Sequence, residues 1–302
     1  MSAAAVEKND DTKMFCAACG TAEGDDIKLK RCNGCYLVRY CSVKCQKDHR
    51  PKHKKECKKR AAELRDEILF KQPESTHQGD CPICCLPLPN ITGKIRLCSC
   101  CCKYICAGCN YTNQKREYER NLQQKCPFCR EPAPKTEEES DKQLMKRVEA
   151  NDPVAVRQLG KIRYKEGDYE TAFEYLNRAA ALGDAEAHYQ LSLMYLKGLF
   201  VEKDEKKELH HLTEAAIGGH PGARFNLACL EGRNGRVDRA VKHFIIAAKL
   251  GHDSSLENLK NGYKDGVVSK EDFDAALRGY QATVEATKSP QREEAYAYEL
   301  TT

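Results

Sequence analysis

Residues 152–160 read DPVAVRQLG, and this nine-residue pattern recurs three more times along the chain. The later copies are DAEAHYQLS at 184–192, HPGARFNLA at 220–228 and HDSSLENLK at 252–260. A second series lies between them: NRAAALG at 177–183, TEAAIGG at 213–219 and IIAAKLG at 245–251. Self-similarity at a period of roughly 30 to 40 residues is typical of repeat proteins, in which each unit is one supersecondary element.

Each unit is predicted to consist of two antiparallel helices. The first helix carries a leucine, and the second carries a pair of alanines small enough to let the helices approach closely. Gly183, Gly219 and Gly251 follow the second helices and suit the left-handed conformation of a helix stop. The leucines are Leu159, Leu191, Leu227 and Leu259.

These units resemble Sel1-like repeats, which are relatives of the tetratricopeptide repeat. The resemblance covers about 148–290 and implies a short right-handed α-solenoid with a concave face for protein ligands. The fourth unit is degenerate, because Lys260 replaces a small residue and no double alanine follows. We interpret it as a capping helix pair. The predicted fold is therefore mainly α, with two small modules followed by this solenoid over 142–290 and a tail over 291–302.

Cysteines dominate the chain before the repeats. Of 19 cysteines, all but Cys229 precede residue 130, mostly as pairs two or three residues apart. This spacing lets a short backbone point two sulfurs at one tetrahedral Zn²⁺. The first residues lack the apolar core of a signal peptide, and no long apolar stretch follows, so a disulfide framework and a membrane span are both disfavoured. We expect a reducing compartment, the cytosol or the nucleus.

The first cluster resembles a MYND zinc finger over 16–57, on the ligand spacing and on Tyr40-Cys41-Ser42 and Cys45-Gln46. Where the family usually has a tryptophan beside its peptide groove, this chain has His49, which leaves peptide specificity open. The family's interleaved pattern implies that one zinc is held by Cys16, Cys19, Cys41 and Cys45, and the other by Cys32, Cys35, His53 and Cys57.

The second cluster resembles a RING domain over 81–130, with CPIC at 81–84 and CPFCR at 126–130. The resemblance implies that Cys81, Cys84, Cys106 and Cys109 share one zinc, and that Cys126 and Cys129 share another with two of Cys98, Cys100 and Cys101. The spacing leaves that choice open. Ile83 matches the apolar contact to a ubiquitin-conjugating enzyme (E2), and Arg130 matches the position that bridges E2 and ubiquitin. About four zinc ions per chain are expected.

The domain boundaries follow from these clusters and from changes in composition. The order of the modules also resembles a multi-domain family known from diatoms, whose members mostly lack an assigned activity. The expected segments are 1–12 disordered, 13–60 the MYND-type finger, 61–80 a helix and linker, 81–130 the RING-type finger, 131–141 a linker, then the solenoid and the tail.

The formal net charge of +5 is a weak argument for nucleic-acid binding. Zinc-bound cysteines are thiolates, so about four sites would remove most of the positive charge of the N-terminal half. The basic run KHKKECKKR at 52–60 is interpreted as a solvated helix face, with phosphate contact as the alternative. Nucleic acid and membranes are not expected partners.

The sequence favours a zinc-binding protein-interaction adaptor over a small-molecule enzyme, because it has no phosphate loop, GxSxG or HExxH motif. One hypothesis is a RING-type E3 ubiquitin ligase that positions a charged E2 while the solenoid and the MYND finger bind substrate and peptide ligands. No residue would act as a nucleophile. The alternative is a non-enzymatic zinc-finger and Sel1 scaffold, so the sequence leaves enzymatic activity undecided.

Overall fold

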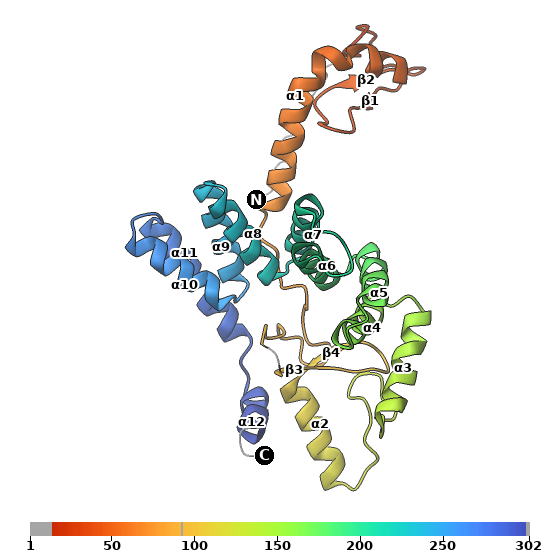
Figure 1. Cartoon of the computed structure of the whole chain (residues 1–302), viewed down its shortest axis with the longest axis vertical. Coiled ribbons are helices and arrows are strands. Elements are labelled where there is room, and N and C mark those ends of the chain that lie inside the picture. The colour runs from red at the N-terminus through yellow and green to blue at the C-terminus, as the bar shows by residue number, and fades with distance from the viewer. Residues whose placement is uncertain (1–13, 92, 300–302) are drawn as a thin grey trace, which may run out of the picture. The chain divides into compact units, whose positions relative to one another are not determined.

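The computed structural model describes residues 14–91 and 93–299, so the predicted disorder of 1–12 lies outside the described residues. The chain forms two compact units, Met1–Leu69 and Phe70–Thr302, each of which is described by itself. Figure 1 labels their helices and strands. Among the described residues, none of the helices has the length and the apolar character needed to cross a bilayer.

The first unit contains a two-stranded sheet and one long helix. Strand β1 (Lys30–Arg31) pairs antiparallel with β2 (Arg39–Tyr40), and α1 (Val43–Leu69) follows. The buried residues of α1 are His53 and Leu69, so apolar packing covers little of its surface. The sequence predicted helix at 52–60 and within 61–80, whereas α1 begins earlier, at Val43, and carries three of the predicted metal ligands.

The second unit begins with the linker 73–80 and the second cysteine module. Strand β3 (Ile95–Leu97) pairs antiparallel with β4 (Tyr104–Cys106), with Arg96 opposite Ile105. Helix α2 (Ala107–Glu119) continues directly from β4. Ile105 and Leu88 are buried together with the cysteines of this module, so its small core is built largely around sulfur.

Helix pairs follow in the order that the repeats predict, and Figure 1 shows them stacked one after another from green to blue. The leucines of the first series and the alanine pairs are buried between them, which confirms the mainly α, Sel1-type solenoid. The helices are α3 (Glu137–Glu149), α4 (Pro153–Lys165), α5 (Tyr169–Ala181), α6 (Ala185–Lys197), α7 (Glu205–Ile217), α8 (Pro221–Arg233), α9 (Val237–Lys249), α10 (Asp253–Lys264), α11 (Lys270–Ala286) and α12 (Pro290–Glu299).

The first residue of each recurring nine-residue motif is a helix N-cap. Asp152 and Asp184 accept backbone N–H bonds through their carboxylates, at the starts of α4 and α6. His220 and His252 do the same through Nδ1, at the starts of α8 and α10. The change from aspartate to histidine along the array therefore keeps the cap, because both side chains offer an acceptor to the first turn.

Two segments expected to be irregular are helical. Helix α3 starts within the predicted linker 131–141, because Thr136 caps the amide of Glu139 at 3.2 Å and three glutamates occupy the first turn. Helix α12 occupies most of the predicted tail 291–302. Ser289 caps it and Pro290 opens it, a combination that favours a helix start.

The second cysteine module packs against the repeats. Cys102 lies in one core cluster with Val148 and Leu144 of α3. Ser99 donates a 2.7 Å hydrogen bond to Gln143 of the same helix. The separation of 81–130 and 142–290 into two domains stays a prediction, because in the structure these segments belong to one compact unit.

Candidate metal centres

The first unit brings eight predicted ligands into two groups, in each of which all ligand atoms lie within 4.8 Å of one another. Sulfurs bound at about 2.3 Å to one tetrahedral ion lie about 3.8 Å apart. The Sγ atoms of Cys32 and Cys57 are 3.8 Å apart, and those of Cys41 and Cys45 are 3.6 Å apart. The groups are Cys16, Cys19, Cys41 and Cys45, and Cys32, Cys35, His53 and Cys57.

The second unit contains two further groups of four cysteines that meet the same distance limit. One joins Cys81 and Cys84 to Cys106 and Cys109, across β3 and β4. The other joins Cys126 and Cys129 to Cys100 and Cys101, with Sγ separations of 3.9 Å for Cys101–Cys126 and 3.3 Å for Cys100–Cys129. The donor sets of all four groups fit multiple zinc ions.

The structure favours Cys100 and Cys101 where the sequence left three candidates. Cys98 stays outside the group, and its carbonyl instead accepts the amides of Cys101 and Cys102 in a tight turn. Cys102 has a left-handed backbone, with φ of 53°, and is buried against the repeats. Cys85 is exposed and also lies outside the groups.

In four of the two-residue turns the first cysteine has a pKa below its ordinary value, namely Cys16, Cys32, Cys81 and Cys126. Burial raises the pKa of Cys16, but backbone amides of Cys19, Cys41 and Ala18 donate to its sulfur and bring the pKa to about 6. In the second unit, a hydrogen bond from Cys106 and the turn's own amides lower the pKa of Cys81 to about 4, against the effect of burial. Within the group of Cys81, burial raises the pKa of Cys109 to about 12. Four adjacent thiolates therefore need a cation such as Zn²⁺.

The two predicted E2-contact residues are both accessible. Ile83 lies in the first cysteine turn with 41% exposure, and Phe128 occupies the matching place in the last turn with 42%. Arg130 has a left-handed φ of 65°, and its guanidinium donates to Oδ1 of Asn113 at 3.1 Å. It also lies 3.6 Å from the buried carboxylate of Glu117. Sequence motifs gave no sign of Asn113 or Glu117, which only the fold places beside Arg130.

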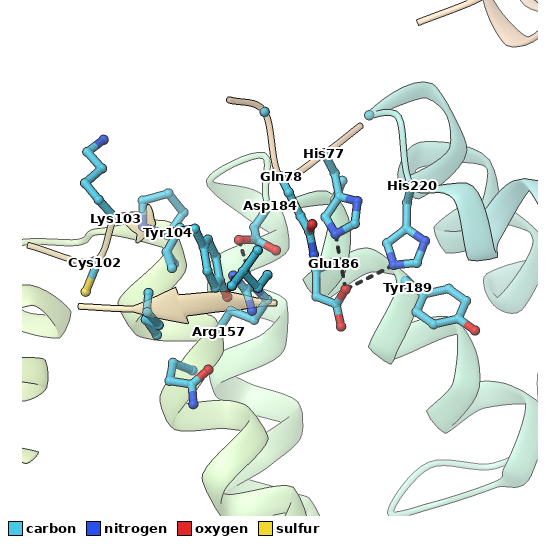
Figure 2. A pocket seen from close by; sticks show the side chains of 18 of the residues that line it. His77, Gln78, Cys102, Lys103, Tyr104, Arg157, Asp184, Glu186, Tyr189 and His220 are labelled. Atoms are coloured by element: carbon cyan, nitrogen blue, oxygen red, sulfur yellow. Dashed lines mark hydrogen bonds and ion pairs between the residues drawn. The ribbon is translucent and has the colours of Figure 1, made fainter. Parts of the chain in front are cut away.

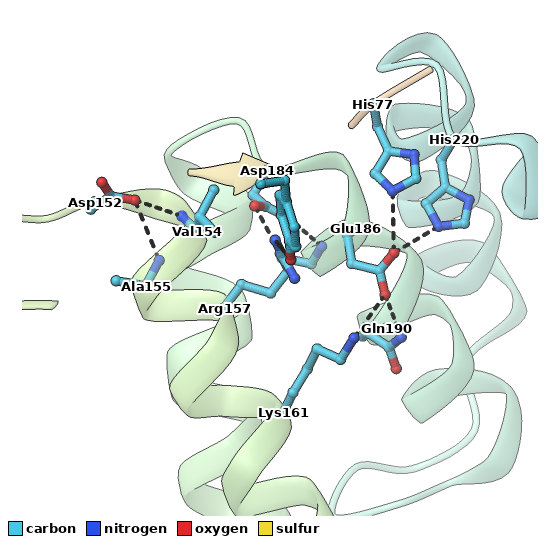
Figure 3. Close-up of polar contacts among 12 residues, drawn as sticks. His77, Asp152, Val154, Ala155, Arg157, Lys161, Asp184, Glu186, Gln190 and His220 are labelled. Atoms are coloured by element: carbon cyan, nitrogen blue, oxygen red, sulfur yellow. Dashed lines mark hydrogen bonds and ion pairs between the residues drawn. The ribbon is translucent and has the colours of Figure 1, made fainter. Parts of the chain in front are cut away.

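A fifth group of candidate ligands lies outside the cysteine modules, in a cavity of about 1010 Å³ beside the repeats (Figure 2). His77 of the linker and His220 at the start of α8 both direct Nε2 at Oε2 of Glu186, at 3.4 and 3.0 Å (Figure 3). Gln190 donates to the other carboxylate oxygen at 2.8 Å. Sequence analysis missed this cluster, because His77 lies in a polar linker without a motif.

The chemistry of this cluster fits hydrogen bonding better than metal binding. Nδ1 of His220 accepts the amide of Ala223, so the ring's proton sits on Nε2, which donates to Glu186. The rings of His77 and His220 are also stacked, with 19° between their planes. Burial raises the pKa of Glu186, but both histidines and Lys161 outweigh it and hold that pKa far below its ordinary value.

The rest of the cavity wall is occupied by a buried ion pair. Arg157 donates from Nε to Asp184 at 2.9 Å and from an Nη atom to the hydroxyl of Tyr104 at 3.0 Å. Burial lowers the pKa of this arginine, and the carboxylate and the hydroxyl raise it above its ordinary value. The bonds among Tyr104, Arg157 and Asp184, which Figure 2 labels, therefore join the cysteine module to the first two repeats.

Comparison with known families identifies two kinds of module. Residues 16–57 match the MYND finger family, and residues 154–184, 185–220 and 221–252 match the Sel1 repeat. These matches confirm both resemblances and the presence of modules that mediate protein interactions. The RING resemblance of 81–130 and the diatom architecture stay predictions.

Curated proteins and solved structures match over limited regions. The chain is 37% identical over 59 residues to SET domain and MYND-type zinc finger protein 6 of Schizosaccharomyces pombe, covering 20% of this chain and 12% of that protein. It is 58% identical over 31 residues to histone-lysine N-methyltransferase SMYD3 of Homo sapiens, covering 10% and 7%. The chain thus spans about a tenth of the length of these relatives.

Two solved structures are similar to part of this chain. A Sel1 repeat protein from Oxalobacter formigenes is 24% identical, with a TM-score of 0.44, over 59% of this chain and 72% of that one. The protective antigen c5321 of uropathogenic Escherichia coli is 23% identical, with a TM-score of 0.40, over 56% of this chain and 37% of that one.

A MYND finger, Sel1 repeats and cysteine tetrads on one chain together support a zinc-binding protein-interaction adaptor.

Proposed function

We propose that this adaptor is a RING-type E3 ubiquitin ligase, with 81–130 recruiting a ubiquitin-charged E2. The observation that carries the proposal is the interleaving of the two cysteine groups in the second unit. Each group takes one pair from the start or the end of the module and another pair from its middle, an order that agrees with the cross-brace expected for a RING domain. The E2, the substrate and the peptide ligand of the MYND finger are the partners this function requires.

The catalytic role would be to position the E2, without a nucleophile from this chain. Ile83 and Phe128 are exposed on the two outer cysteine turns, where an E2 loop could bury them. The guanidinium of Arg130 is held by Asn113 and Glu117, and half of the side chain remains exposed. An arginine restrained in this way loses less entropy when it bridges E2 and ubiquitin.

The test is autoubiquitination by the zinc-loaded full chain with purified E1, ubiquitin and a panel of E2s. Ile83→Ala and Arg130→Ala should each lower the rate about tenfold, which corresponds to about 1.4 kcal/mol of lost binding. Ile91→Ala is the matched control for an exposed isoleucine of the same module. Arg116→Ala is the control for Arg130, because Arg116 contacts the same Asn113 and Glu117. Equal activity in all four variants would exclude this mechanism.

The second candidate is a non-enzymatic scaffold, and the packing of 81–130 on the repeats supports it. The buried pair between Arg157 and Tyr104 and the burial of Cys102 give this module a structural role whether or not an E2 binds. Titration of each E2 against the zinc-loaded chain separates the two candidates. If no E2 binds the chain and none transfers ubiquitin in its presence, the scaffold is favoured.

A further inference from the structure

The C-terminal helix α12 packs directly on the second cysteine module. It lies against α2 (Figure 1), and Lys115 of α2 pairs with Glu294 at 2.7 Å. At Gly108 the two backbones touch, since an added Cβ would lie 2.8 Å from the amide nitrogen of Arg292. Gly108 stands between the ligands Cys106 and Cys109, so α12 meets the module at its first metal group.

Arg292 extends from α12 into this metal group and is fully buried. One terminal nitrogen donates to the carbonyls of Pro87 and Thr287, both at 2.7 Å. The other donates to the carbonyl of Leu86 at 3.2 Å and to Sγ of Cys84 at 3.4 Å. Arg292 thus contacts a predicted zinc ligand, Cys84, from which it is separated by more than 200 residues of sequence.

Charge explains why an arginine is suited to this place. A buried guanidinium is always protonated and is costly unless an anion compensates it. The carbonyl acceptors of Arg292 carry no net charge, whereas four thiolates around one Zn²⁺ carry a net charge of −2. The cation and the metal centre therefore compensate each other, and the arginine itself is fully buried.

We propose that Arg292 is an outer-sphere residue of the zinc centre formed by Cys81, Cys84, Cys106 and Cys109, and that it positions Cys84 and slows loss of the metal. The inference rests on zinc occupying this group, as the proposed function also requires. Groups that hydrogen-bond metal ligands typically change metal affinity by about 10- to 100-fold when they are mutated. Helix α12 is then a part of the metal site and not a tail.

The experiment compares zinc release from the full chain in wild type, Arg292→Met, Arg292→Lys and Lys115→Met, with a chromogenic chelator. Arg292→Met keeps an unbranched apolar stem and removes the guanidinium with its charge and donors, and should speed release of about one zinc per chain at least tenfold. Arg292→Lys should release it at an intermediate rate. Lys115→Met removes an exposed ion pair from the same helix interface and should match wild type.

A second measurement separates an outer-sphere role from packing. In chains loaded with ¹¹³Cd, Arg292→Met and Arg292→Lys should both shift one tetrathiolate resonance, because the N–H donor to Cys84 is removed or altered. Lys115→Met should leave that resonance in place. Wild-type release rates and an unshifted resonance in both Arg292 variants would overturn the proposal.

Total metal content distinguishes failure of this inference from failure of the proposed function. If the wild-type chain holds no metal at 81–109, the RING interpretation falls together with the inference. If the metal is present but insensitive to Arg292, only the inference falls. Should Arg292→Met not fold, the comparison of Arg292→Lys with Lys115→Met still decides the outcome.

Discussion

Arg157 donates a 3.0 Å hydrogen bond to the hydroxyl of Tyr104, across 53 residues of sequence. The bond joins strand β4 of the second cysteine module to α4 of the first repeat. Because Arg157 is buried and also holds Asp184, the two modules share one polar junction in their interface.

Removing this hydroxyl should destabilise the second unit. Tyr104→Phe leaves one donor of a buried arginine without a partner, which costs about 2 kcal/mol. The measurement is the free energy of unfolding from urea denaturation of the zinc-loaded chain. Tyr118→Phe is the control, because Tyr118 is 84% exposed. Equal losses in both variants would mean that the Arg157–Tyr104 bond contributes nothing to stability.

The choice among Cys98, Cys100 and Cys101 can be tested by metal content. Cys98→Ser should retain about four zinc ions per chain, because its side chain lies outside the tetrad. Cys100→Ser and Cys101→Ser should each lose about one, because a hydroxyl is a poor substitute for a thiolate on zinc. Plasma mass spectrometry of the purified variants gives the answer. Loss of zinc from Cys98→Ser alone would reverse the assignment.

The stability of the second unit should fall as the pH is lowered below about 6.5. Burial lowers the pKa of His220 from its ordinary value of 6.5, so the unfolded chain takes up a proton at a pH where the native histidine is still neutral. Stability is therefore full above pH 6.5 and declines below it. His188, His211 and His252 are shifted in the same direction by burial and add to the slope.

The contribution of His220 can be isolated with His220→Asn, because asparagine is also a good helix cap. This variant should show a shallower decline of unfolding free energy between pH 7.5 and 5.5. His210→Asn, at an exposed histidine, should keep the wild-type slope. A slope in His220→Asn as steep as in wild type would contradict the assignment.

Damage to the first finger should stay local. Cys57→Ser removes one ligand of the group that contains His53, and a segment of this size has too little apolar area to fold without metal. Hydrogen exchange should rise across 16–57, while α4 to α11 keep their protection, because they belong to the other compact unit. Loss of protection in those helices would show that the two units fold together.

Local patterns carried most of what the sequence could predict. The cysteine pairs, the buried leucines such as Leu191 and the alanine pairs depend on neighbours a few residues away or one repeat away, so their spacing reveals their role. The same holds for Gly219, whose φ of 80° is the predicted helix stop. Its lack of a side chain also admits the carbonyl of Ser75, which the repeat pattern did not indicate.

Contacts between distant segments could not be predicted from the sequence. His77 meets Glu186 over more than 100 residues, and Arg292 meets Cys84 over more than 200, and neither belongs to a periodic pattern. The choice of Cys100 over Cys98 depends on a turn whose geometry the spacing of three nearby cysteines does not define. Helix α12 was not predicted within the segment expected to be a tail, because a single short segment outside the repeats offers no periodic pattern.

The helix caps change along the repeats from aspartate, at 152 and 184, to histidine, at 220 and 252. The two halves of the array should therefore respond differently to acid. Aspartate as a residue type remains an acceptor well below neutrality, whereas an imidazole that takes up a proton at Nδ1 stops accepting and puts a positive charge at the positive end of a helix. Unravelling in mild acid should therefore start in the C-terminal half of the array and advance toward the cysteine modules.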